Sequence, residues 1–158
     1  MYRKVRDNTV TELRLKDGKL AIGDRTELTP TGAGKFSAGE RQFIFEGAGF
    51  REVTADGETV YERVEPVHPK ASELAAFAGV YESPETDAPV TVAVKGEDLM
   101  LTVASNAPVK LRPSFRDAFM MRGSSIRFLR DSSGKVTGMS AGDDRAWDIR
   151  FTRVGGGR

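Results

Sequence analysis

Ser132 and Lys135 stand in the Ser-x-x-Lys spacing, in which a lysine on the next turn of a helix activates a serine nucleophile. Here, however, Asp131 precedes the serine and Gly134 lies between the two residues. Aspartate and glycine at such positions are typical of a hairpin turn, in which the serine and lysine side chains splay apart. We therefore predict a turn here and no catalytic residue in this chain.

Residues that bind metals or cofactors are equally sparse. The chain has one histidine, His68, and no cysteine. His68 lies in a proline-containing segment, residues 65–70, where we expect an exposed side chain. Asp143 and Asp144 lie close to Asp148 but lack the spacing of a calcium-binding loop, so an acidic turn explains them. We expect no metal site and no cofactor.

Four apolar residues, Phe119, Met120, Met121 and Trp147, are candidates for lining a pocket. A barrel of about eight strands can hold one small ligand. The alternative is a core filled by side chains, which is the usual state of small barrels.

Arg116 and Asp117 form a charged pair shortly before Phe119. Such a pair in a loop either makes a structural salt bridge or contacts a partner. A loop salt bridge is the simpler interpretation.

Short β-strands must position these residues. Valine or leucine recurs at every second position along residues 90–95 and 99–103, a period of two that puts one face of each strand on a core. Glycine-containing pairs such as Asp17-Gly18 and Lys95-Gly96 separate such runs, because glycine readily adopts the positive φ of tight hairpins. The pattern predicts an all-β fold built from antiparallel sheets.

The chain contains an internal repeat. Leu28, Pro30, Phe36, Phe43 and Phe45 match residues of the second half in order and in spacing. The matched positions are Leu111, Pro113, Phe119, Ile126 and Phe128, and further matches join Tyr2 to Tyr81, Leu13 to Val92, Leu20 to Leu99 and Tyr61 to Phe151. Repeated matches in one order indicate a tandem duplication. We therefore expect two consecutive antiparallel β-barrels.

The junction between the copies has its own signature. Residues 65–70 contain two prolines and are typical of a linker, and Ser72 is a candidate N-cap for a short helix that carries Leu74 and Phe77 on one face. This helix can plug one end of the barrel that follows it. We predict a first barrel over residues 1–66, a second over 70–154 and a flexible tail over 155–158.

The two copies differ in length. No equivalent helix precedes Tyr2, so we expect a first barrel shortened at its N-terminus. The second copy is longer near its end, which leaves room for an extra hairpin around residues 135–147.

Charge and composition exclude several classes of protein. The 158 residues carry 24 basic and 23 acidic side chains, a net charge of +1, so a nucleic-acid-binding surface is not expected. The sequence contains no apolar run long enough to span a membrane, and residues near Met1 lack the apolar core expected of a signal peptide.

The second copy also resembles a known module. Residues 74–85 resemble its opening pattern L-x-x-y-x-G-x-Y-x-S-x-E, and residues 111–119 its central L-x-P-x-x-x-D-x-F. Residues 126–138 and 150–154 resemble its closing v-x-F-x-r-d-x-x-G-k-v-x-G and F-x-R-v. This module is the lipocalin-like C-terminal domain of serine β-lactamase-like hydrolases, a group that includes β-lactamase relatives, esterases and D-aminopeptidases.

The resemblance implies that the catalytic residues lie in another domain and that this domain is the partner of the present chain. In that family they belong to a separate N-terminal domain, whose motifs do not occur here. In D-aminopeptidases two barrels follow the catalytic domain, and a barrel loop restricts access to the active site. By analogy, the segments around Arg116 and Asp117 and around Asp143 and Asp144 are candidate gating or partner-contact loops.

The leading hypothesis is a non-catalytic accessory module that packs on the serine hydrolase domain of the same parent chain. It would shape substrate access or mediate homo-oligomerisation, and by family analogy it would be exported or periplasmic. The alternatives are a free-standing binder of small apolar ligands and a hydrolase that uses Ser132 and Lys135.

Overall fold

The computed structural model describes residues 1–155 and divides the chain into two units. The first unit is Met1–Glu65, and the second begins at Pro66. The linker residues after Pro66 group with the second unit, where the Val67 amide donates a hydrogen bond to the Ser114 carbonyl at 3.1 Å. The last three residues of the predicted tail, 156–158, lie outside the described residues.

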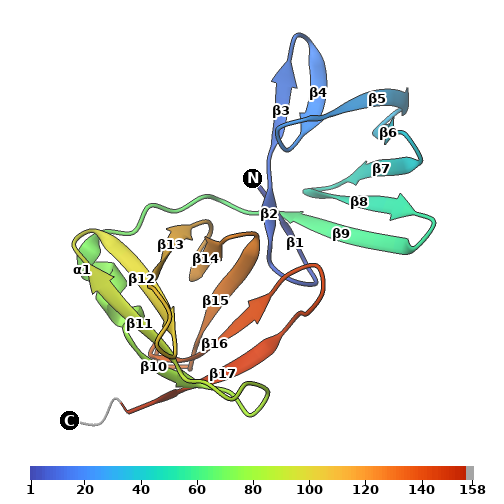
Figure 1. Ribbon diagram of the computed structural model, residues 1–158. Coiled ribbons are helices and arrows are strands. Elements are labelled where there is room, and N and C mark those ends of the chain that lie inside the picture. The colour runs from blue at the N-terminus through green and yellow to red at the C-terminus, as the bar shows by residue number, and fades with distance from the viewer. Residues whose placement is uncertain (156–158) are drawn as a thin grey trace. The chain divides into compact units, whose positions relative to one another are not determined.

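The second unit is a closed barrel of eight antiparallel strands (Figure 1). Each strand pairs with the next along the chain, and the last pairs with the first. The strands are β10 (Gly79–Glu82), β11 (Val90–Lys95), β12 (Asp98–Val103), β13 (Val109–Pro113), β14 (Ala118–Met121), β15 (Ser124–Arg130), β16 (Val136–Gly142) and β17 (Ile149–Val154). Complete closure leaves no strand edge exposed.

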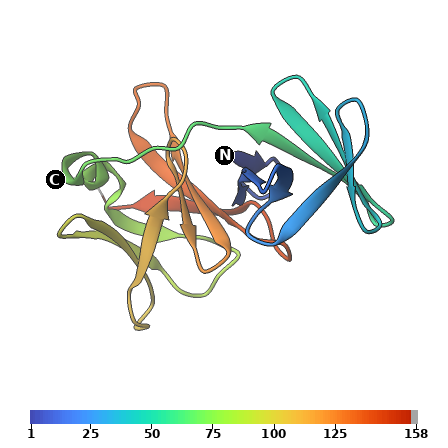
Figure 2. The ribbon, with the colours of Figure 1, turned by 90° about the horizontal axis from the view of Figure 1, so that it is seen from above.

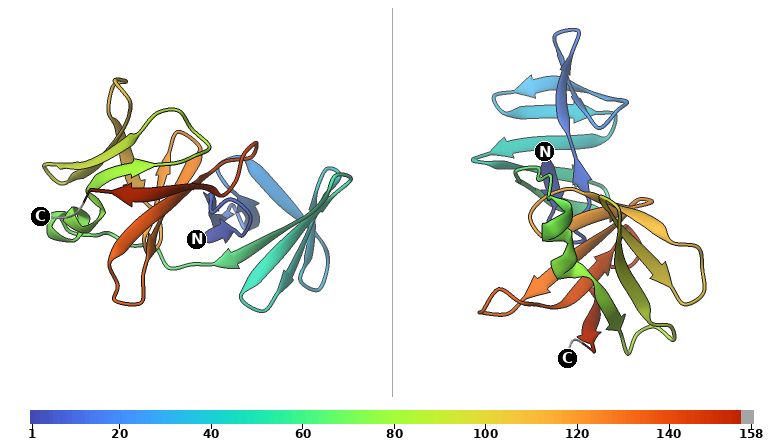
Figure 3. Two further views of the ribbon diagram at one scale, coloured as in Figure 1. Left: turned by 90° about the horizontal axis from the view of Figure 1, so that it is seen from below. Right: turned by 90° about the vertical axis from the view of Figure 1, so that its left-hand side faces the viewer.

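The first unit is a strongly curved sheet of nine antiparallel strands, drawn from blue to teal in Figure 3. Its strands are β1 (Tyr2–Lys4), β2 (Val10–Thr11), β3 (Leu13–Lys16), β4 (Lys19–Ile22), β5 (Thr26–Gly32), β6 (Lys35–Ala38), β7 (Arg41–Glu46), β8 (Gly49–Thr54) and β9 (Gly57–Arg63). Strands β2 and β3 form opposite edges of this sheet, yet Glu12 alone separates them in the chain. One bent segment thus reaches both edges, and the sheet is nearly closed.

These two sheets confirm the prediction of an all-β chain with two consecutive antiparallel units and a short helix between them. Within the described residues, no helix is long and apolar enough to cross a membrane.

The matched positions of the repeat lie on corresponding strands and pair in the same register. The pairs are Leu20–Leu28, Phe36–Phe43 and Tyr2–Arg63 in the first unit, and Leu99–Leu111, Phe119–Ile126 and Tyr81–Arg153 in the second. Since register is fixed by which side chains face the core, this agreement means that both copies turn the same positions toward the core. If β2 and β3 are counted as one bent strand, both units are eight-stranded meanders.

A glycine in each unit marks a further correspondence. A Cβ atom on Gly138 would lie 2.5 Å from the Phe151 carbonyl oxygen, and one on Gly49 would clash with the Tyr61 carbonyl in the same way. Only glycine allows so close an approach of two backbones. The two glycines therefore belong to the repeat, although the pattern of apolar residues did not reveal them.

The extra hairpin expected around residues 135–147 is absent from the described structure. Strand β16 continues to Gly142, and a single loop over residues 143–148 leads into β17. The additional residues lengthen two connections, 131–135 and 143–148, which replace the tight turns after β7 and β8 of the first unit. Insertions collect in such loops because they cost little there.

A short helical segment precedes the barrel and contributes to its core. It consists of α1 (Ala71–Leu74) and η1 (Ala75–Phe77), and it lies at one end of the barrel (Figure 2). The N-cap is Lys70 rather than the predicted Ser72, because the Glu73 carboxylate accepts a hydrogen bond from the Lys70 amide at 2.7 Å. Leu74 and Phe77 are buried in the core of the barrel.

Two barrel side chains hold this segment in place. The buried Tyr81 hydroxyl donates a hydrogen bond to the Phe77 carbonyl at 2.7 Å. The Arg153 guanidinium donates to the carbonyls of Ala76 at 3.3 Å, Val136 at 3.2 Å and Ala78. Carbonyls at a helix end need such partners, because no further turn of helix satisfies them.

Tyr81 gives the second unit a pH dependence in the alkaline range. Burial raises the pKa of Tyr81 to about 12, above the usual value of 10.0. As the pH rises, the Tyr81 hydroxyl loses its proton in the unfolded chain before it does so in the folded one. The contribution of Tyr81 to the free energy of unfolding is therefore complete below pH 10 and is lost as the pH rises toward 12. In Tyr81→Phe we expect a stability lower by about 1–3 kcal/mol at neutral pH and a shallower decline above pH 10.

Urea unfolding followed through Trp147, the single tryptophan, measures the second unit in both proteins. An equally steep decline above pH 10 in Tyr81→Phe would contradict this assignment.

Candidate functional site

The loop between β13 and β14 is a tight turn that fixes Asp117. The Ser114 amide donates a hydrogen bond to the Ala118 carbonyl at 3.0 Å, and the Ala118 amide donates to the Phe115 carbonyl at 2.9 Å. Asp117 has a φ of +59°, a left-handed conformation that aspartate tolerates better than most residues. The Asp117 carbonyl also accepts a hydrogen bond from the Phe128 amide at 2.7 Å, which ties the loop to β15.

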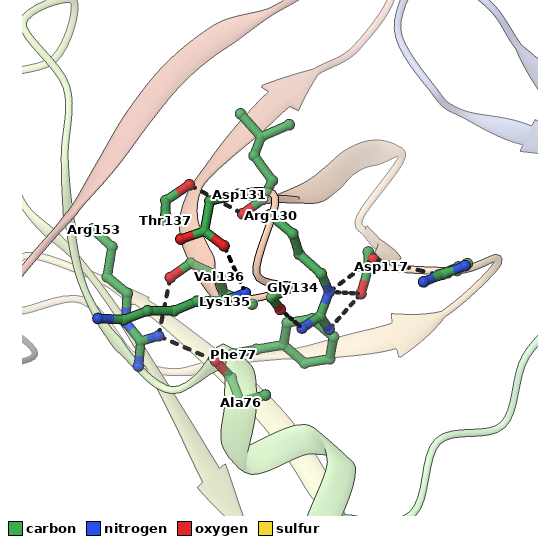
Figure 4. Close-up of polar contacts among 12 residues, drawn as sticks. Ala76, Phe77, Asp117, Arg130, Asp131, Gly134, Lys135, Val136, Thr137 and Arg153 are labelled. Carbon is green, nitrogen blue, oxygen red and sulfur yellow. Dashed lines mark hydrogen bonds and ion pairs between the residues drawn. The ribbon is translucent and has the colours of Figure 1, made fainter.

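The Asp117 carboxylate binds the guanidinium of Arg130 with both oxygens. The Arg130 Nε atom lies 2.9 and 3.0 Å from the two carboxylate oxygens, and Nη2 lies 2.7 Å from one of them. Arg130 Nη1 donates to the Gly134 carbonyl at 2.8 Å, and the guanidinium carbon lies 5.2 Å from the Phe77 ring centre (Figure 4). The hydrogen bonds to Asp117 raise the pKa of Arg130. The guanidinium is thus held in one orientation.

Arg116 and Asp117 have different roles in the structure. The Arg116 side chain is 89% exposed, and its Nε lies 3.9 Å from the Asp117 carboxylate, a weak contact. The close partner of Asp117 is Arg130, which our sequence analysis did not single out. The register of the β14–β15 hairpin identifies Arg130 as this partner. Ala118 pairs with Arg127, which brings Asp117 and Arg130 to diagonal positions.

A pocket of about 370 Å³ adjoins this ion pair. It is lined by linker residues, the helical segment, the loop and the start of β14: Val67, His68, Pro69, Glu73, Phe77, Phe115, Arg116, Asp117, Phe119 and Arg130. Its size lies within the range of small-molecule sites. Aromatic rings and charged groups line it together, and none of these described lining residues is a serine, cysteine or lysine.

The pocket unites three of the residues singled out from the sequence, Arg116, Asp117 and Phe119, and it adds His68 of the linker. The position of His68 was not predictable from its neighbours in sequence. It depends on the hydrogen bond between Val67 and Ser114, which holds the linker beside the loop.

The four apolar candidates do not form one pocket in the structure. Phe119 is buried in the core, and Met121 packs against the same core from its edge. Met120 follows Phe119 on β14 and therefore points to the other face of the sheet. Trp147 is 51% exposed, in the loop before β17. The barrel interior is filled by aromatic and aliphatic side chains, the alternative that we had left open.

Asp143 and Asp144 lie in the loop between β16 and β17. The Asp143 carboxylate accepts hydrogen bonds from the amides of Arg145 at 2.8 Å and Ala146 at 2.9 Å. The pKa of Asp143 is lowered, chiefly by the hydrogen bond from Ala146 and then by that from Arg145. Asp144 is exposed. Asp143 thus stabilises its own turn. Nowhere in residues 1–155 do three or more histidine, aspartate or glutamate side chains form a group that could hold a metal ion.

Residues 131–135 form the turn between β15 and β16, as predicted. One Asp131 carboxylate oxygen accepts hydrogen bonds from the Ser133 hydroxyl at 2.6 Å and from the amides of Ser133 at 2.9 Å and Lys135 at 3.0 Å. These bonds, led by that from the Ser133 hydroxyl, lower the pKa of Asp131. Ser132 and Lys135 therefore do not share a helix face.

Comparison with known families gives one match. Residues 63–153 match the model of a family described as a domain of unknown function, DUF3471. The chain belongs to this family. The match begins at the end of β9 and includes the linker, the helical segment and nearly all of the barrel, so the second unit is the DUF3471 domain. No curated protein matches the chain.

The ion pair of the DUF3471 domain is measurable in a double-mutant cycle. We expect Asp117→Asn and Arg130→Gln each to lower the free energy of unfolding by about 0.5–1.5 kcal/mol, with a coupling energy of about 0.5–1 kcal/mol that salt reduces. The control is Arg116→Gln, which changes stability by less than about 0.5 kcal/mol because that side chain is exposed. A coupling energy near zero, or an equal effect of Arg116→Gln, would show that this pair does not fix the loop.

Proposed function

We propose that this chain is a non-catalytic accessory module of a serine β-lactamase-like hydrolase. It packs on the catalytic domain of the same parent chain, where it shapes substrate access or mediates oligomerisation. The motifs of residues 74–85, 111–119, 126–138 and 150–154 support this assignment, since they resemble those of the C-terminal domains of such enzymes. By the same analogy, the module is exported with its parent enzyme.

The proposal rests on the location of free space in the DUF3471 domain. Its interior is packed, and Tyr81, Phe119 and Phe128 are each at most 2% exposed. The ordered charged groups, Asp117 and Arg130, lie instead beside a pocket that the linker borders. A domain built in this way offers its rim and loops to other molecules rather than its centre.

The same observation weighs against a free-standing carrier of apolar ligands. A carrier of that kind encloses its ligand, and burial of most of the ligand surface requires an interior cavity. In the DUF3471 domain, Phe77 packs 4.5 Å from Phe128 and 5.3 Å from Phe119, measured between ring centres, where an enclosed ligand would lie.

The proposal is tested on the natural polypeptide. An antibody raised against this chain is used to isolate its antigen from producing cells, and the product is treated with a fluorophosphonate or a fluorescent penicillin. We expect a polypeptide much longer than 158 residues that carries the covalent label on a serine outside this chain. An unlabelled polypeptide of 158 residues would contradict the proposal.

A control separates this outcome from catalysis by the chain itself. The purified chain and its Ser132→Ala variant are treated with the same reagents, and neither is expected to be labelled. Labelling of the purified chain that Ser132→Ala abolishes would establish the chain as a hydrolase in its own right.

A further inference from the structure

Equivalent core positions are buried to different degrees in the two units. Six positions of the second unit are at most 8% exposed, whereas the side chains that match them in the first unit are only partly buried. The pairs are Tyr2 and Tyr81, Leu13 and Val92, Leu20 and Leu99, Phe36 and Phe119, Phe45 and Phe128, and Tyr61 and Phe151. These residues share strand and register, and the two units differ in two respects. The second sheet is fully closed and is preceded by a helical segment, whereas the first sheet is only nearly closed and its described residues include no helix.

In the second unit, the helical segment packs into the core that these side chains form. The Phe77 ring lies against Phe119 and Phe128, and Leu74 belongs to the same core. Phe119 and Phe128 meet edge to face, with ring centres 5.7 Å apart and planes at 86°. This aromatic pair is the surface on which Phe77 rests.

The first unit has the same aromatic pair, in nearly the same geometry. Phe36 and Phe45 also meet edge to face, with ring centres 5.4 Å apart and planes at 80°. Neither ring is fully buried.

The polar groups that hold the helical segment are duplicated as well. Tyr81 and Arg153 bind its carbonyls, and they pair with each other across β10 and β17. Tyr2 and Arg63 pair across β1 and β9 in the same way. Among the described residues, no hydrogen bond involves the Tyr2 hydroxyl. The Arg63 side chain is 63% exposed, and its only described ion pair is a loose one, with Nε 3.7 Å from Glu65.

The other end of the first sheet is closed by its own polar residues. Arg41 Nε lies 2.6 Å from the Glu52 carboxylate, which also accepts a hydrogen bond from the Tyr61 hydroxyl at 3.1 Å. Arg41 begins β7, and Phe45 lies four residues later, about 13 Å along the strand. The ion pair therefore occupies one end of the sheet, and a helix fits at the opposite end, where Phe36 and Phe45 lie.

We propose that the first unit is a docking site for a short helix with leucine and phenylalanine three positions apart, of the type found in residues 70–80. The phenylalanine of the helix rests on Phe36 and Phe45. The Tyr2 hydroxyl and the Arg63 guanidinium donate hydrogen bonds to the carbonyls at the end of the helix. The occupant is defined by the second unit, which binds such a helix with the matching four residues, and the inference does not depend on the proposed hydrolase association.

The test supplies this helix at the equivalent position. A copy of residues 70–80 replaces Met1, so that its phenylalanine precedes Tyr2 by the same four positions as Phe77 precedes Tyr81. The matched control carries serine in place of the leucine and phenylalanine of the added segment. Amide hydrogen exchange in β6 and β7 is measured for the unextended chain and both extended chains.

We expect exchange in β6 and β7 to slow by at least about tenfold in the extended chain and not in the serine control. Arg63→Ala is expected to reverse much of this protection while changing the unextended chain little, because Arg63 is exposed there. Equal protection by both extensions, or protection by neither, would overturn the proposal.

The oligomeric state tests the competing occupant. If exchange in β6 and β7 of the unextended chain slows with increasing protein concentration, a second copy of the chain covers this surface. That result would also overturn the proposal.

Discussion

The hydrogen bonds between Arg153 and the carbonyls of the helical segment are the interaction on which the second unit depends. The guanidinium joins the end of the segment, at Ala76 and Ala78, to strands β16 and β17 of the barrel. This contact, with that of the Tyr81 hydroxyl, sets the depth of Phe77 inside the barrel. Because Phe77 completes the core, the interior has little room for a ligand, and interaction with other molecules falls to the rim and the loops.

The repeat allowed most of the fold to be predicted from the sequence. The alternation around Val92 and Leu101 set which face of each strand is buried, and the matched prolines and phenylalanines set which strands correspond. The helix cap at Lys70 and the long loop over residues 143–148 were not predictable in this way. Both depend on local hydrogen bonds and on where an insertion is tolerated, which hydrophobic periodicity does not encode.

The candidate site was predicted only in part. The adjacent opposite charges of Arg116 and Asp117 drew attention to this loop, but the partner of Asp117 depends on the register of a hairpin. Arg130 stands thirteen residues further along the chain and becomes a neighbour only once β14 and β15 pair. The position of His68 beside the pocket depends on residues even further apart in the chain. The linker is held at the loop by a hydrogen bond between backbone groups, which no side chain in the sequence indicates.

The central claim is that the helical segment, rather than the sheet, completes the buried core of a unit. Native-state amide exchange of the intact chain tests it most directly, because β14 and β15 correspond in register to β6 and β7. The account predicts exchange at least about tenfold faster in β6 and β7 than in β14 and β15. Equal protection of the two pairs of strands would contradict it, since the sheets alone would then suffice to bury their cores.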